Sequence, residues 1–225
     1  MKWNSFLRHI AIFAAAGILL PSLAMAQDTA PVAAVPTAAA APAADIDFSK
    51  LPEPMAFAKE RYAHALKLNA MAPSATRDNE IKAFVDALVD YDDYAKRSMG
   101  DKWAGLTAEK QTEFKTLFRD LMEQTYLKRF SDKSFKDDNK VDWDRVVKTK
   151  TSATVSCFTQ QKDVETELEI VLHADGNAWK VYDVLVDGAS LAQTYQKKYG
   201  KKIDEKGVDG IMADMKTEIA KLHKK

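Results

Sequence analysis

Residues 141–186 carry the pattern that most limits how this chain can fold, because apolar and polar side chains alternate there as they do in β-strands. The alternation is clearest in "VETELEIVL", residues 164–172, and weaker in 141–147 and 153–160. An Asp-Gly pair then marks a tight turn into a fourth apolar segment, 178–186. The pattern predicts four antiparallel strands connected one after another as a meander.

The last of these segments, "AWKVYDVLV", is apolar on both of its expected faces. Strict alternation divides its large apolar side chains into two sets on opposite faces: Trp179, Val181 and Leu185, and Tyr182, Val184 and Val186. An antiparallel strand with one face in water would not show this pattern. The second face therefore needs a cover, either of helices or of a bound apolar molecule. The sequence leaves open which set faces inward.

Helical periodicity flanks the strands on both sides. Before the strands, helices are expected at 54–68, from Asp78, where the aspartate would cap the helix, and from Thr107, which would cap a third. After the strands, helices are expected at 190–199 and 209–222. This order predicts an α+β domain with helices packed on one face of a curved four-stranded antiparallel sheet. Such a sheet can enclose an apolar pocket between itself and the helices.

The first 44 residues differ in composition from the rest of the chain. Residues 1–26 combine a positive start, a short apolar run and small residues at the end, which is typical of a secretory signal peptide cleaved after Ala26. An uncleaved N-terminal anchor is the alternative. Residues 27–44 are rich in Ala and Pro and indicate a flexible tether. The folded domain is then 45–225.

The charge balance argues against a nucleic-acid partner. The chain holds 33 Lys and Arg against 33 Asp and Glu, whereas a nucleic-acid-binding face is strongly basic. A local basic run is made by Lys197, Lys198, Lys201 and Lys202. It is interpreted either as the solvated end of a helix or as a docking patch for an acidic partner or an anionic membrane.

Motifs of catalysis are scarce. No two histidines have metal-ligand spacing, a glycine-rich phosphate loop is absent from the sequence, and we predict no metal and no cofactor. The segment "GASLA" lacks the closing glycine of a nucleophile elbow, so Ser190 is predicted to cap a helix. The single cysteine, Cys157, is predicted to be a small buried apolar residue. The chain is predicted not to be an enzyme. The alternative is an enzyme that uses Asp183 as a base on an apolar substrate.

Large apolar side chains are more numerous than an obvious core requires. We interpret part of this excess as the lining of a pocket for an apolar guest, with ordinary core packing as the alternative for each residue. The candidate residues for this lining are Trp103, Phe114, Phe118, Leu121, Val155, Leu168, Ile170, Tyr182, Val184, Val186 and Tyr195.

Three segments together resemble the MlaC family, also described as the toluene-tolerance auxiliary component of an ABC transport system. They are "RSMGDKWAGLTAEKQTEFKTLFRDLMEQTY", "WKVYDVLVDGASLAQTYQKKY" and "KGVDGIMADMKTEI", and the likeness runs from about Asp78 to Leu222. The resemblance implies a periplasmic protein with a cone similar to nuclear transport factor 2, whose deep apolar pocket holds phospholipid tails.

The same resemblance implies a role in transport. Members of the family carry lipid between an outer-membrane lipoprotein–porin complex and an inner-membrane complex of an MCE-domain protein and an ABC transporter, which maintains the lipid asymmetry of the outer membrane. Another apolar lipid, such as a hopanoid, is an alternative cargo. An envelope adaptor that binds no lipid is a further alternative.

Overall fold

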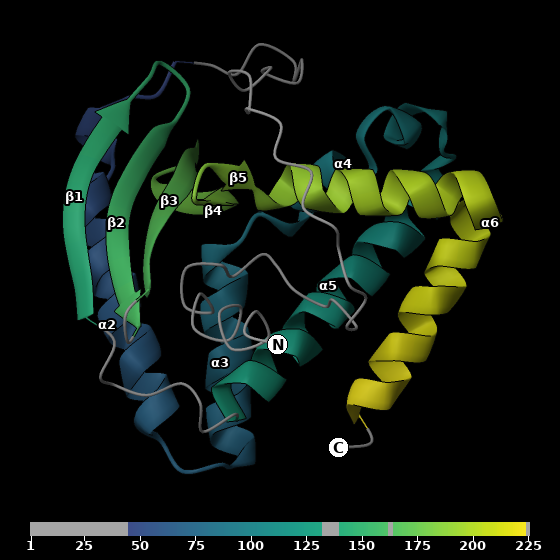
Figure 1. Ribbon diagram of the computed structural model, residues 1–225, viewed down its shortest axis with the longest axis horizontal. Helices are drawn as coiled ribbons and strands as arrows, with labels where there is room; N and C mark the ends of the chain where they lie inside the picture. Colours follow the sequence, from purple (N-terminus) through teal and green to yellow (C-terminus); the bar gives the residue numbers. More distant parts are fainter. Residues whose placement is uncertain (1–44, 132–139, 162–163, 224–225) are drawn as a thin grey trace.

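The computed structural model describes residues 45–131, 140–161 and 164–223. The predicted signal peptide and tether lie outside the described residues, as do residues 162–163 of the loop between the second and third strands. The described part is an α+β fold, in which helices precede and follow one antiparallel sheet (Figure 1). The α+β class expected from the sequence is therefore confirmed.

The sheet has five strands, and the prediction of four was wrong. In the order of the sheet they are β1 Lys140–Lys148, β2 Ala153–Gln161, β3 Val164–Asp175, β4 Ala178–Val186 and β5 Ala189–Ser190.

The fifth strand exists because Asp187 and Gly188 both have positive φ angles, 48° and 77°. Two such residues reverse the chain in a two-residue turn. Ala189 and Ser190 consequently pair with β4 before the last helix begins.

One extra residue in β4 explains why this strand is apolar on both expected faces. Val171 of β3 pairs with Asp183, but its neighbour Leu172 pairs with Val181, so Tyr182 is a bulge without a partner. A bulge reverses the alternation of the residues that follow it. As a result, the apolar side chains before and after the bulge share the inner face of the sheet: Trp179, Val181, Val184 and Val186. The two sets that strict alternation would separate are thus mixed.

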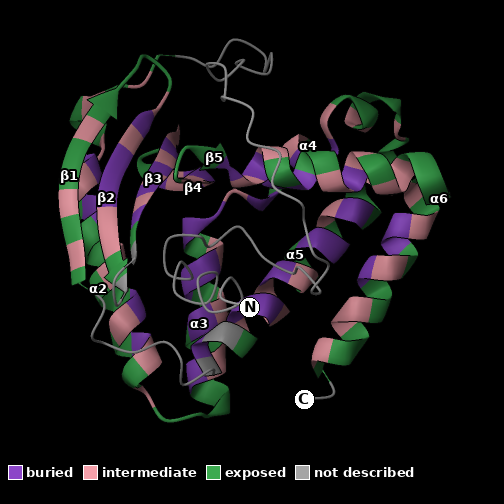
Figure 2. Cartoon of the chain, in the orientation of Figure 1, coloured by how far each residue is buried: buried purple, intermediate pink, exposed green. Residues whose placement is uncertain are grey.

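The helices before the sheet are α2 Pro54–Ala70, α3 Ala75–Leu88, α4 Tyr91–Met99 and α5 Ala108–Ser131, with short 3-10 helices η2 Phe48–Lys50 and η3 Gly100–Gly105. Helix α2 contacts β1 and β2, whereas α3 and α4 contact β4. Figure 2 shows that the buried residues of helices and strands face one another. The sheet contributes to this core through paired residues on one face: Val155, Cys157, Leu168, Ile170 and Leu172.

Helix starts follow local capping chemistry. The hydroxyl of Thr107 accepts from the backbone N–H of Lys110 at 3.4 Å, which confirms the predicted cap of α5. Helix α3 begins earlier than expected, because Ser74 is its cap and accepts from the N–H of Arg77 at 3.1 Å. Asp78 instead lies in the first turn, where its negative charge suits the helix dipole.

The last helix, α6 Leu191–His223, is broken at Gly207, whose φ of 71° and ψ of 173° are not helical. We call residues 191–206 the first arm of α6 and residues 208–223 the second arm. In Figure 1 the first arm runs horizontally from β5 to the right, and the second arm turns down beside α5. The two helices expected here are therefore present, and the first is longer than its predicted end at residue 199.

The single cysteine is predicted to be unreactive in the folded protein. Cys157 is fully buried, and burial raises the pKa of its thiol to about 12. At pH 8 about one thiol in ten thousand would then be ionised, and the thiolate is the reactive form. We expect Ellman's reagent to label no cysteine in the native protein and one cysteine in urea. Stoichiometric labelling of the native protein would contradict this burial.

Candidate functional site

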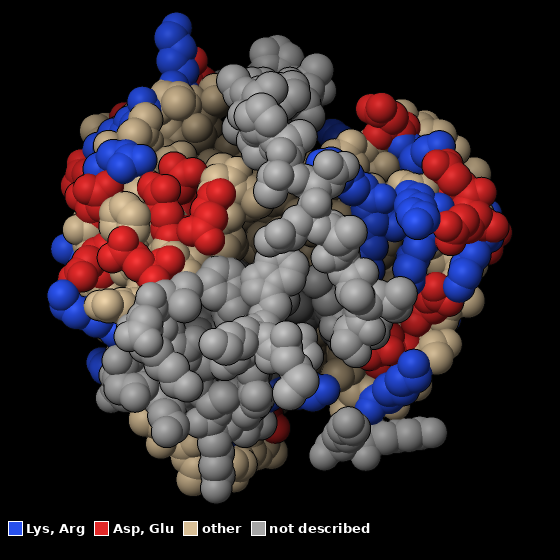
Figure 3. Space-filling view, in the orientation of Figure 1, with Lys and Arg blue, Asp and Glu red and all other residues tan. Residues whose placement is uncertain are grey.

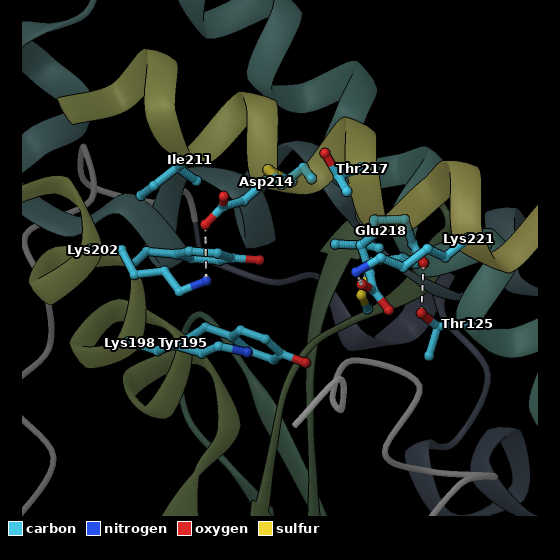
Figure 4. A pocket seen from close by; sticks show the side chains of 13 residues that line it. Thr125, Tyr195, Lys198, Lys202, Ile211, Asp214, Thr217, Glu218 and Lys221 are labelled. Atoms are coloured by element: carbon cyan, nitrogen blue, oxygen red, sulfur yellow. Dashed lines mark hydrogen bonds and ion pairs between the residues drawn. The ribbon is translucent and has the colours of Figure 1, made fainter. Parts of the chain in front are cut away.

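A cavity of about 250 Å³ lies between α5 and the two arms of α6 (Figure 4). Three elements that are distant in the sequence build it. Helix α5 provides Leu121, Met122 and Thr125, and the first arm provides Tyr195, Lys198, Tyr199 and Lys202. The second arm provides Ile211, Asp214, Met215, Thr217, Glu218 and Lys221.

The apolar part of the lining is made of flexible or branched aliphatic side chains. Met122, Ile211 and Met215 are each less than 5% exposed, and Leu121 packs against the core beside them. Methionine adapts its shape at low cost because its chain is unbranched and rotates about three bonds. This wall therefore suits an aliphatic guest of variable shape.

The polar part of the lining is charged. Lys202 and Lys206 bind the carboxylate of Asp214 at 3.3 and 3.1 Å, and these hydrogen bonds hold the pKa of Asp214 below its ordinary value. Lys221 pairs with Glu218 at 3.2 Å. Apolar and charged side chains thus share one cavity, as they would around a molecule with a polar end and an apolar end.

An aromatic cluster supports the cavity from behind. Tyr195 stacks on Tyr199 with ring centres 5.8 Å apart, and Tyr199 meets the edge of Phe114 at 6.0 Å. Phe114 in turn contacts Phe118 and Trp103. Burial raises the pKa of the Tyr199 phenol above its ordinary value, so this residue stays neutral at physiological pH.

The structure divides the predicted lipid-binding residues into three groups. Leu121 and Tyr195 line the cavity. Trp103, Phe114 and Phe118 belong to the aromatic cluster next to it. The remainder lie in the sheet, away from the cavity: Val155, Leu168, Ile170, Val184 and Val186 on the inner face, and Tyr182 at the bulge.

Tyr182 is held by a contact that the sequence pattern does not show. The guanidinium of Arg97 lies over its ring at 4.3 Å, and His173 packs against it at 5.2 Å. A guanidinium over an aromatic face is a favourable cation–π contact. Contact of lipid with Tyr182 and with the inner-face residues of the sheet stays a prediction.

Local sequence patterns do not mark most of the cavity residues as a site. Ile211 and Met215 recur at helical spacing, which indicates a buried stripe but not a cavity. Lys198 and Lys202 are four residues apart, so they lie on one side of the helix. This spacing is the sequence feature that separates Lys198 and Lys202 from Lys197 and Lys201 on the helix.

Asp183 is fully engaged by donors of its own chain. Its carboxylate accepts from the backbone N–H of Val184 at 2.8 Å and of Ala192 at 3.1 Å, and from the hydroxyl of Ser190 at 2.6 Å. Burial raises the pKa of this carboxyl above its ordinary value, although the three bonds oppose the shift. Ser190 also accepts from the N–H of Gln193 at 3.1 Å, which confirms its predicted role as a helix cap. This geometry anchors the start of α6 to β4.

Within residues 45–131, 140–161 and 164–223, no group of three or more histidine, cysteine or acidic side chains could hold a metal ion. In the same described ranges, no helix has both the length and the apolar character needed to cross a bilayer.

Comparison with known proteins identifies the family. The family model described as MlaC protein matches residues 60–217. The chain belongs to the MlaC family. The MlaC match includes α5, the first arm of α6 and most of the second arm, so all of the cavity residues except Glu218 and Lys221 fall inside it.

A solved structure shares the MlaC fold seen here. It is the phospholipid-binding protein from Ralstonia solanacearum, determined in complex with a phospholipid. It superimposes with a TM-score of 0.61 at 20% sequence identity, and the match covers 76% of this chain and 99% of that chain. At this identity the likeness concerns the fold. No curated protein matches the chain.

Proposed function

We propose that this MlaC-family protein is a periplasmic carrier of phospholipid. The family match over residues 60–217 carries the proposal. Two observations support it: the fold is shared with a protein that was solved with a phospholipid, and α5 and α6 form a partly open cavity with aliphatic and charged walls. The contacts of Asp183 with its own chain favour a structural role for this residue over a catalytic one.

The proposed carrier takes lipid from one envelope complex and delivers it to another. Its partners are an outer-membrane lipoprotein–porin complex and an inner-membrane complex of an MCE-domain protein and an ABC transporter, and its task is to maintain outer-membrane lipid asymmetry. Two acyl chains with about 30 CH₂ groups gain on the order of 20 kcal/mol on leaving water. A bilayer offers the same gain, so a pocket that matches the membrane permits both uptake and release.

Loading requires the cavity to grow. Its volume of about 250 Å³ is below the range of about 300–1,000 Å³ that is usual for drug-sized ligands, and a phospholipid is larger than these. The second arm of α6 can provide the space, because the helix is interrupted at Gly207 and the arm can turn about this residue. The ion pairs Lys110–Asp209 and Lys216–Glu113 link this arm to α5, and such exposed pairs each contribute about 1 kcal/mol or less.

Lipid content and lipid transfer test the proposal directly. We expect mass spectrometry of the purified protein to find phospholipid in stoichiometric amount, and the protein to speed phospholipid transfer between donor and acceptor vesicles. If mass spectrometry finds a hopanoid instead of phospholipid, the protein is a carrier of a different lipid. A protein without lipid and without transfer activity would contradict the carrier and favour an adaptor.

A matched pair of variants connects this activity to the cavity. Thr217 and Thr112 are both exposed threonines in helices, and each donates its hydroxyl to the carbonyl four residues earlier at 2.9 Å. Only Thr217 lines the cavity. Thr217→Trp is therefore expected to lower the bound phospholipid several-fold, whereas Thr112→Trp leaves it unchanged. Equal loading of the two variants would place the lipid elsewhere.

A further inference from the structure

The fold divides the basic run of α6 into two sides. Lys198 and Lys202 line the cavity, whereas Lys197 and Lys201 are exposed and lie outside its lining. Figure 3 shows Lys and Arg side chains gathered in the angle between the two arms of α6, with acidic side chains beside them. The run is therefore not only a solvated helix end, because half of it faces a partly open cavity that also has aliphatic walls.

Charge in the cavity is unevenly balanced. The lining contains three lysines and two carboxylates, which leaves one positive charge in excess. The two carboxylates, Asp214 and Glu218, are paired with Lys202 and Lys206 and with Lys221 respectively. The negative charge of both carboxylates is consequently offset by lysines of the same helix.

Lys198 is partly buried in the cavity wall, close to a second cation, Lys202. It is half-buried, its ammonium is 5.9 Å from the centre of the Tyr195 ring, and Figure 4 shows it beside Lys202 and Tyr195. Burial lowers the pKa of Lys198, and the charge of Lys202 lowers it further, while Glu218 opposes the shift. An anion placed between Lys198 and Lys202 would relieve both effects.

We propose that Lys198 and Lys202 bind the phosphate group of the cargo lipid, whose acyl chains start along Leu121, Met122 and Met215. This inference rests on the proposed carrier function and makes its cargo a phosphate-bearing lipid. A phosphate has several acceptor oxygens and can bond two ammonium groups at once. Asp214 keeps Lys206 as a partner when Lys202 turns to the phosphate.

Two fluorescent lipids with identical acyl chains test the phosphate site. Phosphatidylglycerol carries the phosphate, and diacylglycerol lacks it. Lys198→Met and Lys202→Met are expected to weaken phosphatidylglycerol binding by roughly tenfold, as for loss of one charge-assisted hydrogen bond, and to leave diacylglycerol binding within about twofold. Lys197→Met and Lys201→Met are matched controls, since they remove the same charge from the outer side of the same arm. They should bind both lipids like the wild type.

Inorganic phosphate separates a lipid head group from a site for free phosphate. We expect it to compete only weakly with phosphatidylglycerol and not with diacylglycerol, because the acyl chains supply most of the affinity. Tight binding of inorganic phosphate that is unaffected by lipid would overturn the inference. So would equal losses for the two lipids, or equal losses in the control variants.

Binding by the wild type and by the variants distinguishes a wrong phosphate site from a wrong carrier function. If the wild type binds neither lipid, the carrier proposal itself fails. If the wild type binds phosphatidylglycerol and the two cavity variants bind it equally well, only the phosphate site fails. Thermal unfolding of each variant shows whether a loss comes from misfolding. A folded variant with the expected loss supports the inference, and loss of folding in one variant leaves the other to decide.

Discussion

Cross-linking α5 to the second arm of α6 is expected to stop phospholipid loading almost completely. The side chains of Glu113 on α5 and Lys216 on the second arm are joined by an ion pair of 2.6 Å, so cysteines at these positions are within reach of a short bis-maleimide linker. The linker would keep the second arm from moving away from α5. The cavity of about 250 Å³ could then not widen to accept two acyl chains. Vesicle-to-vesicle transfer by the protein, cross-linked while empty, measures the effect.

A second cross-link provides the control for this experiment. Lys115 on α5 and Asp92 on α4 form an ion pair of 2.7 Å, so the same linker can join them without touching either arm. This variant should transfer lipid normally, as should the first double variant treated with a monofunctional maleimide. Cys157 should not interfere, because it is buried. Normal transfer after the first cross-link would show that the lipid enters by another route.

Gly207→Ala is expected to destabilise the fold by about 1–3 kcal/mol, because the new side chain must adopt a backbone conformation that is almost restricted to glycine. The φ of 71° and ψ of 173° at this position set the angle between the two arms of α6. The variant must either accept the strain or straighten the helix, and straightening would remove the second arm from α5. Urea unfolding followed by circular dichroism measures the loss.

The same substitution seven residues earlier should have the opposite sign. Gly200 lies in the helical first arm, its φ is not positive, and a Cβ added there meets no atom within 4 Å. Gly200→Ala should stabilise the protein by about 0.5–1 kcal/mol, since alanine loses less backbone freedom than glycine in a helix. If both variants changed stability in the same direction, Gly207 would not be the strained position described here.

Local sequence patterns predicted the features of a single helix or strand that depend only on neighbouring residues. The alternation in 164–172, the caps at Thr107 and Ser190 and the helix after Thr107 depend on residues a few positions apart, and the structure confirms them. The short strand β5 was missed because two residues are too few to show a period.

The bulge at Tyr182 shows where pattern analysis fails. Alternation alone assigned Trp179 and Val184 to opposite faces, but pairing with β3 places both on the inner face. An unpaired residue has no signature in one strand, because it is defined by the register of the partner strand. The outward contact of Tyr182 with Arg97 follows from the same register.

The candidate site was predictable only in part. Leu121 and Tyr195, two of the predicted lipid contacts, line the cavity, and their contact with lipid stays a prediction. Lys198, Lys202 and Asp214 were not expected to do so, since their sequence neighbourhood is that of an exposed helix. A charged side chain at such a position faces either solvent or a cavity, depending on which helices approach it.

The sequence by itself determined the α+β class, the meander, the near-neutral charge and the family, because each of these follows from residue type and short-range spacing. Only the tertiary structure decided which apolar residues share a face, where the cavity lies and which two lysines of four enter it. The physical reason is that the cavity is made by contact between α5 and two arms whose angle depends on one glycine. Such contacts join residues that are almost a hundred positions apart, and no local period records them.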